Sequence, residues 1–202
     1  MKVLLCALSL ILPAGLWLGA TEPSAASTAP TDASGSYQID PVHSSIVFGV
    51  KHLGVAWFYG TFNEIKGSFT LDEKEPGKST VEIEIPVASI DSRSEKRDGH
   101  LKSADFFSAA EFPTIRFKST KVAKAKDGYQ VDGDLTMHGV TKPISFVATL
   151  VGTSQEKGTR TGFGVDTTIR RSEFGMSFML PDGLGDEVRL LFGIEGTIRQ
   201  AR

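Results

Sequence analysis

The run VRLLFGIEGTI, residues 188–198, decides the fold class of this chain. Apolar side chains occupy every second position, and Arg189, Glu195 and Thr197 stand between them. Successive side chains of a strand point to opposite faces, so a period of two predicts a β-strand with one buried and one solvent-facing side. The buried face would carry Val188, Leu190, Phe192, Ile194, Gly196 and Ile198.

Seven further runs, all N-terminal to residues 188–198, repeat this alternation. They cover residues 46–50, 65–71, 81–85, 115–117, 131–135, 144–150 and 163–169. Turn-forming sequences such as Asp127-Gly128 and Pro181-Asp182-Gly183 separate them. Short connections predict antiparallel neighbours, because a parallel crossover needs a dozen or more residues. The chain is therefore expected to be all-β, with about eight strands.

One-sided strands in this number must pack as two sheets or close on themselves. We predict an extended eight-stranded antiparallel barrel, since closure removes exposed edges and leaves room for side chains or one ligand. A two-sheet sandwich is the alternative. The charged segment 92–103 breaks the pattern and predicts one short helix, capped by Asp91 or Ser92. That helix is either a lid or a solvated connection packed by its apolar residues.

The N-terminus has the layout of an export signal. Lys2 precedes an uncharged, Leu-rich stretch that runs to Ala20, which predicts a signal peptide over residues 1–20 with cleavage as late as Ala26. An uncleaved membrane anchor is the alternative. Residues 21–36 are small and polar and predict a flexible linker before a domain at 37–200. We expect a periplasmic or secreted protein without a membrane span once the signal is removed.

Composition argues against several classes of function. A net charge of -2 leaves no footprint for nucleic acid. The single cysteine, Cys6, lies inside the signal, so disulfides and thiolate metal sites are not expected. The four histidines show no metal spacing, and no Gly-x-Ser-x-Gly motif occurs. We therefore predict no metal, no cofactor and no catalytic residue. An enzyme that pairs His43 or His52 with a carboxylate is the alternative.

Motifs along the domain resemble those of one known family. They are YQIDPVHS at 37–44, RDGHLKSADFF at 97–107, FPTIRF at 112–117, GDLTMHGVTK at 133–142 and RSEFG at 171–175. In these the chain is similar to the polyisoprenoid-binding YceI-like proteins. The resemblance implies a lipocalin-like barrel, a bacterial periplasmic or secreted location, and an isoprenoid chain in the pore. A homodimer is a family-level expectation.

The inward positions of the alternating runs then become the predicted site. The predicted pore-lining residues are Ile46, Phe48, Val50, Phe69, Phe117, Leu135, Phe146, Phe163, Ile169, Phe174, Met176, Phe178, Phe192 and Ile194. Candidate contacts to a polar headgroup are His43, His52, Arg170 and Arg171. The expected role is a carrier, store or sensor of long-chain lipid. A filled core, as in a stress-response protein without a fixed ligand, and a membrane barrel with its apolar side outward also fit the alternation.

Overall fold

The computed structural model describes residues 32–156 and 159–198. The predicted signal peptide and residues 21–31 of the predicted linker lie outside this range. The described strands are β1 Gly35–Ile39, β2 Ser45–His52, β3 Ala56–Phe62, β4 Lys66–Leu71, β5 Thr80–Pro86, β6 Ile90–Asp91, β7 Thr114–Ala125, β8 Gly128–Met137, β9 Val140–Ser154, β10 Arg160–Arg170 and β11 Leu184–Ile198. One α-helix, α1 Glu95–Leu101, and three 3-10 turns, η1 Pro76–Lys78, η2 Val87–Ser89 and η3 Arg171–Phe174, complete the fold.

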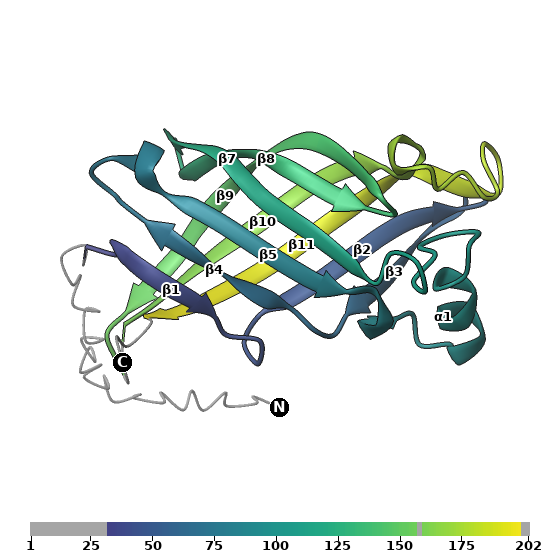
Figure 1. Cartoon of the computed structure of the whole chain (residues 1–202), viewed down its shortest axis with the longest axis horizontal. Helices are drawn as coiled ribbons and strands as arrows, with labels where there is room; N and C mark the ends of the chain where they lie inside the picture. Colours follow the sequence, from purple (N-terminus) through teal and green to yellow (C-terminus); the bar gives the residue numbers. More distant parts are fainter. Residues whose placement is uncertain (1–31, 157–158, 199–202) are drawn as a thin grey trace, which may run out of the picture. The chain divides into compact units, whose positions relative to one another are not determined.

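Eight of these strands close into an antiparallel barrel. The order is β1-β4-β5-β7-β8-β9-β10-β11, and β11 pairs back with β1 (Figure 1). Tyr37 on β1 makes the closure, because it stands opposite Phe69 of β4 on one side and Ile198 of β11 on the other. The prediction of an eight-stranded all-β barrel is confirmed, and the sandwich alternative is wrong.

Three further strands lengthen the barrel at the end that carries α1. The last residues of β11 pair with β1, and most of the rest of β11 pairs with β2. β1 and β2 therefore follow one another along the same edge of β11, with residues 40–44 as the interruption between them. β3 pairs with β2, and β6 adds two residues beside β3. β9 and β11 have 15 residues each, which corresponds to roughly 50 Å of extended chain. The result is a long tube.

The alternation rule missed β1, β3 and β6. β3 reads AWFYGTF, so aromatic side chains fall on both of its faces and the period of two disappears. Phe58 and Phe62 stand opposite inward residues of β2, whereas Trp57 and Tyr59 point outward. β1 and β6 are too short, at five and two residues, to establish a period.

The boundaries of the helix and of the domain differ from the prediction. α1 spans Glu95–Leu101 rather than 92–103, because Ser92 is fixed outside it: its backbone N–H donates to the Asp98 carboxylate at 2.8 Å. The predicted linker also ends too late. Ala33 is fully buried, and its carbonyl accepts a hydrogen bond of 2.7 Å from the Tyr37 hydroxyl, so residues 32–36 belong to the barrel.

The apolar positions of the alternating runs face the interior of the barrel. The buried core includes Ile46, Phe69, Ile85, Phe117 and Leu135, one from each of five strands. The opposite face of the same strands carries charged pairs such as Glu84 with Arg116 and Glu82 with Lys118. Among the described residues, no helix has the length and apolar character to span a membrane.

Candidate functional site

An apolar cavity of about 200 Å³ lies inside the barrel. Of the predicted lining set, Ile46, Phe48, Val50, Phe69, Phe117, Leu135, Phe146, Phe163, Ile169, Met176, Phe192 and Ile194 border it. Phe48, Phe146 and Phe192 face inward yet are only partly buried, because they border empty space rather than one another. The interior is therefore hollow, and the alternative of a filled core is wrong.

Glycines on the inner wall help to keep the centre open. Gly60, Gly133 and Gly196 face inward, and each lies beneath a phenylalanine ring: Phe48, Phe117 and Phe69, respectively. A Cβ at Gly133 would come within 2.5 Å of the Phe117 ring. Since there is no side chain below them, the rings lie flat against the wall instead of projecting to the barrel axis.

The β1 end of the cavity is sealed by fully buried side chains. Tyr37, Tyr129 and Thr161 are each at most 2% exposed there. The Tyr37 ring stacks on Phe69 with 4.8 Å between centroids, and Phe163 meets Phe69 edge to face at 5.7 Å. Ligand access at this end would require this aromatic layer to come apart.

The α1 end is covered by a segment that inserts side chains into the opening. Leu101, Phe106 and Phe107, all from the RDGHLKSADFF motif, border the cavity. Arg97 holds this segment in place: its Nε donates to the Ser92 hydroxyl at 2.8 Å, and its guanidinium lies 4.2 Å from the centre of the Phe58 ring on β3. The alternation pattern predicts no pore-lining residue in this segment, because its apolar residues do not fall on every second position.

Arg171 organises the opposite side of the same opening. Its guanidinium is almost completely buried and donates to four backbone carbonyls at 2.8–2.9 Å, those of Met176 and Phe178 in the β10–β11 loop and of Leu184 and Gly185 at the start of β11. Burial lowers the pKa of Arg171, and the nearby Asp186 carboxylate acts in the opposite direction. Of the four predicted headgroup residues, only Arg171 borders the cavity.

The remaining predicted residues lie elsewhere. His52 ends β2 and Arg170 ends β10, and both are exposed. Phe174 is fully buried in η3, where its carbonyl accepts a hydrogen bond of 2.8 Å from Nδ1 of His138. Phe178 is partly exposed and packs on Phe106, with 5.3 Å between ring centroids.

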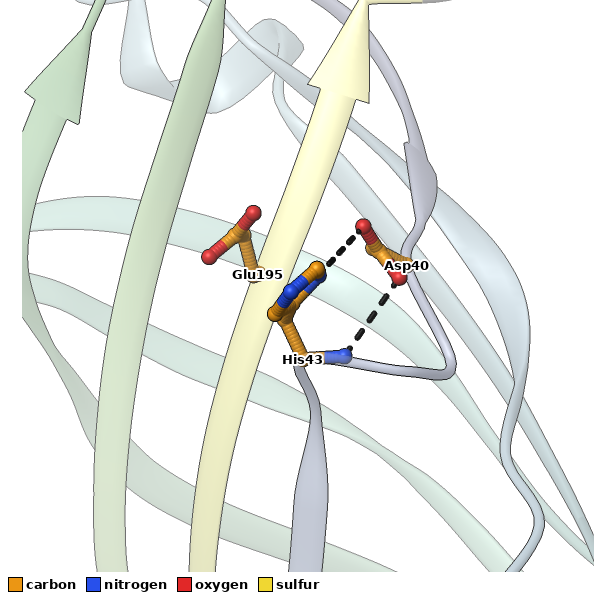
Figure 2. Close-up of side chains that lie close together, drawn as sticks. All are labelled: Asp40, His43 and Glu195. Carbon is orange, nitrogen blue, oxygen red and sulfur yellow. Dashed lines mark hydrogen bonds and ion pairs between the residues drawn. The ribbon is translucent and has the colours of Figure 1, made fainter.

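His43 belongs to an ion-pair network on the outer surface, at the break between β1 and β2. One ligand atom from each of Asp40, His43 and Glu195 falls within 4.8 Å of the others, the spacing of a metal site (Figure 2). Arg160 already bonds both carboxylates, with 3.0 Å from its Nη1 to Asp40. Its guanidinium takes the charge-balancing place of a cation, so the cluster ties the strand break to β10 and β11.

Hydrogen bonds to Asp40 stabilise its ionised form. His43 Nδ1 lies 2.9 Å from Oδ2, and the Val42 backbone N–H donates to Oδ1 at 2.9 Å. These bonds, together with Arg160, hold the pKa of Asp40 at about 2, below its ordinary value of 3.8.

Comparison with known proteins fits this geometry. The YceI-like domain matches residues 37–196. The chain belongs to the YceI-like family. UPF0312 proteins of Pseudomonas aeruginosa and Serratia proteamaculans are both 40% identical to it, over 181 and 186 residues; the matches cover 88% and 90% of this chain and 94% of each relative.

Solved structures share the YceI-like barrel. BcnA of Burkholderia cenocepacia superposes with a TM-score of 0.73 at 22% identity, covering 79% of this chain and 99% of BcnA. A Campylobacter jejuni YceI protein gives 0.65 at 25% identity, covering 74% and 90%. A polyisoprenoid-binding domain from Saccharophagus degradans gives 0.65 at 15%, covering 81% and 98%. The first and third likenesses concern the fold alone.

Gly60→Ala tests the glycine–aromatic packing of the YceI-like barrel. The added Cβ meets the Phe48 ring and forces it toward the axis, which should cost about 1–3 kcal/mol of unfolding free energy. Urea denaturation measures this loss. Gly152→Ala is the matched control, because its Cβ would enter open space and the expected change is within about 0.5 kcal/mol. Equal stability of the two variants would contradict the packing argument.

Arg171→Lys tests the buried guanidinium. A lysine has three donors on one atom and cannot satisfy four separate carbonyls, so we expect a loss of about 3 kcal/mol in unfolding free energy. Arg170→Lys, at the exposed neighbouring position, should change stability by less than about 0.5 kcal/mol. If Arg171→Lys and Arg170→Lys lost the same unfolding free energy, the four carbonyls would have found other donors.

Asp40→Asn tests the surface network through its pH dependence. Because the folded state lowers the pKa of Asp40, its contribution is complete above the unfolded value of about 4 and is lost as pH falls toward 2. We expect the wild type to exceed D40N by about 1–2 kcal/mol at pH 7, and the gap to shrink between pH 4 and pH 2. Denaturant titrations across this range measure it, with Asp134→Asn on β8 as control. A gap that is constant with pH would refute the role of Asp40.

Proposed function

We propose that this chain binds one long-chain lipid of isoprenoid type inside the barrel and acts outside the cytoplasm as a carrier, store or sensor rather than as an enzyme. The observation that carries the proposal is the continuous apolar lining of the cavity. Family membership supports it, as does the fold shared with a domain of S. degradans that is described as polyisoprenoid-binding.

The energetics of such a site favour retention over discrimination. Each buried CH₂ group contributes about 0.8 kcal/mol, so tens of carbons would hold a ligand through purification. A difference of one methylene is worth only about 1–3 kcal/mol, so related chains compete closely. The cavity of about 200 Å³ is smaller than the roughly 300–1,000 Å³ of common ligand sites, so a long chain enters only if interior side chains move apart.

The position beside Arg171, at the α1 end, suits a polar headgroup because Arg171 is the charged residue in the described lining. Four of its five N–H groups bond the four backbone carbonyls, which leaves one donor at the border of the cavity. The hydrocarbon tail then extends toward Tyr129, and Phe106 and Phe107 cover the head as a lid. His43, His52 and Arg170 lie too far toward the outer surface for this role in the described conformation.

The lining disfavours the enzyme alternative. In the described part of the chain, no carboxylate and no histidine borders the cavity, so a convergent acid–base pair is missing from the lining. The polar residues that border it are Thr70, Ser79, Tyr129, Thr167 and Arg171. Such a lining is better suited to holding an amphiphile than to activating it, which supports a binding role.

The proposed location rests on the N-terminal sequence. Export with cleavage after residue 20, or as late as 26, would bring the barrel to a compartment where lipids are exchanged between membranes. Intact-mass measurement of the chain recovered from the bacterial periplasm should show the loss of these residues. A full-length mass would contradict the cleavage, and recovery only from the cytoplasm would contradict the location.

Ligand extraction tests the binding itself. Organic extracts of the purified chain should contain a long-chain lipid at about one molecule per barrel, identified by mass spectrometry. Ala148→Phe places a ring into the void from β9 and should remove most of this lipid. Thr149→Phe adds the same ring on the outer face of β9 and should retain it.

The outcome separates the candidates. Wild-type barrels that stay empty after incubation with isoprenoid lipids would refute the proposal. Equal lipid content in the A148F and T149F chains would place the lipid outside the cavity. A chemically altered lipid recovered after incubation would favour the enzyme alternative.

A further inference from the structure

Exposed apolar side chains gather on two neighbouring turns at the α1 end. Of the ten large apolar side chains that stand exposed in the described residues, five belong to these turns and their margins. They are Leu53, Val55 and Trp57 around the β2–β3 turn, and Phe178 and Met179 in the β10–β11 loop. We call these five residues the apolar rim. The Leu53 backbone N–H donates to the Gly183 carbonyl at 3.0 Å, which joins the two turns.

Two residues of the apolar rim also have a costly backbone conformation. Leu53 and Met179 have φ angles of +52° and +61°, in the left-handed region that glycine and asparagine occupy more readily. The two residues are 58% and 44% exposed, so core packing does not compensate for the strain. Local strain together with exposed apolar surface marks a site that serves a function outside the fold.

The apolar rim lies at the end of the barrel where only side chains cover the cavity. Leu184 borders the cavity and pairs with His52, one residue before the β2–β3 turn. Phe178 packs on Phe106, which also borders the cavity. The opposite end is closed by the buried layer around Tyr37 and Tyr129. Figure 1 shows that α1, the β2–β3 turn and the β10–β11 loop share one end of the barrel.

The chemistry of the apolar rim fits a lipid bilayer. Trp57 points outward, and the Lys51 ammonium lies 5.4 Å from the centre of its ring, a pairing suited to the membrane–water interface. Charges beside the turns are mixed, with Lys51 on one and Asp182 on the other. Attraction would therefore come from apolar insertion rather than from anionic lipid.

We propose that the apolar rim docks on the surface of a lipid bilayer, and that the lipid ligand enters and leaves the barrel there. This inference rests on the proposed function, because a long hydrocarbon chain crosses open water only at a high cost. Docking places the covered opening against the membrane, so that the chain passes from one apolar environment to another.

Vesicle loading tests the proposal. The chain is recovered from the periplasm, so that it carries the N-terminus that export leaves on it, and is mixed with neutral phosphatidylcholine vesicles. Brominated acyl chains should quench the fluorescence of Trp57. The sequence has one other tryptophan, Trp17, which lies in the segment that export is proposed to remove, so a W57F chain should show little tryptophan fluorescence and supplies the background. Loading is followed with a labelled isoprenoid alcohol supplied in vesicles or, separately, in detergent micelles.

The test variant is L53N/M179N. Asparagine tolerates the left-handed conformation, so this chain should be at least as stable as the wild type. We expect vesicle binding and loading from vesicles to fall by about tenfold or more, and loading from micelles to stay unchanged. The control V42N/V151N removes two apolar side chains of greater exposure away from the rim and should behave as the wild type.

Two outcomes would overturn the proposal that the apolar rim docks on a bilayer. In the first, L53N/M179N loads from vesicles as fast as the wild type. In the second, the wild type loads from micelles but does not bind vesicles. In the second case the proposed function stands. Failure of all chains to load from either source would instead refute the proposed function, and the quenching of Trp57 would still decide whether the rim meets the bilayer.

Discussion

Closure of the hydrogen-bonded ring at β1 is the constraint on which the structure depends. A five-residue strand must pair on both sides at once, with β4 and with the end of β11. Closure leaves the ring without a free edge, and it leaves an interior whose width is set by strand number rather than by the side chains inside. The network of Asp40, His43, Arg160 and Glu195 fixes the chain where β1 gives way to β2, so β11 can serve both strands.

The interior of a barrel of fixed width can be filled with side chains or left open. In this barrel the residues of the inner wall determine that it stays open. Phenylalanine is bulky enough to fill the axis, but three of these rings lie over inward-facing glycines and remain at the wall. Hollowness is thus encoded by glycine–phenylalanine pairs across the inner wall, two of them on adjacent strands and the third, Phe69 with Gly196, across β1, and not by a shortage of apolar volume. Tyrosines close one end and can do so because a buried hydroxyl finds a backbone carbonyl, as Tyr37 does at Ala33.

The sequence was sufficient for the barrel and for most of its lining. Period-two runs located β2, β4, β5 and the long strands β7–β11, because one apolar face must be buried along each. It was insufficient where a segment obeys no period. Leu101 and Phe107 reach the cavity from an irregular segment, and Arg171 is distinguished from Arg170 only by its contacts with backbone carbonyls of the connection that follows it and of the start of β11. These contacts depend on tertiary placement, which no local pattern encodes.

An apolar tube discriminates among ligands by little more than chain length and hydrophobicity, since each methylene adds about the same binding free energy. Selectivity must then arise at the opening, where Arg171 provides a directional donor, or from the place at which loading occurs. The β10–β11 loop connects both possibilities. The carbonyls that Arg171 holds belong to Met176, Phe178 and Leu184, so the same guanidinium that borders the cavity also sets the shape of the turn that carries Met179 outward. If the apolar rim docks as proposed, the surface on which the barrel opens would therefore contribute more to lipid selection than the apolar lining does.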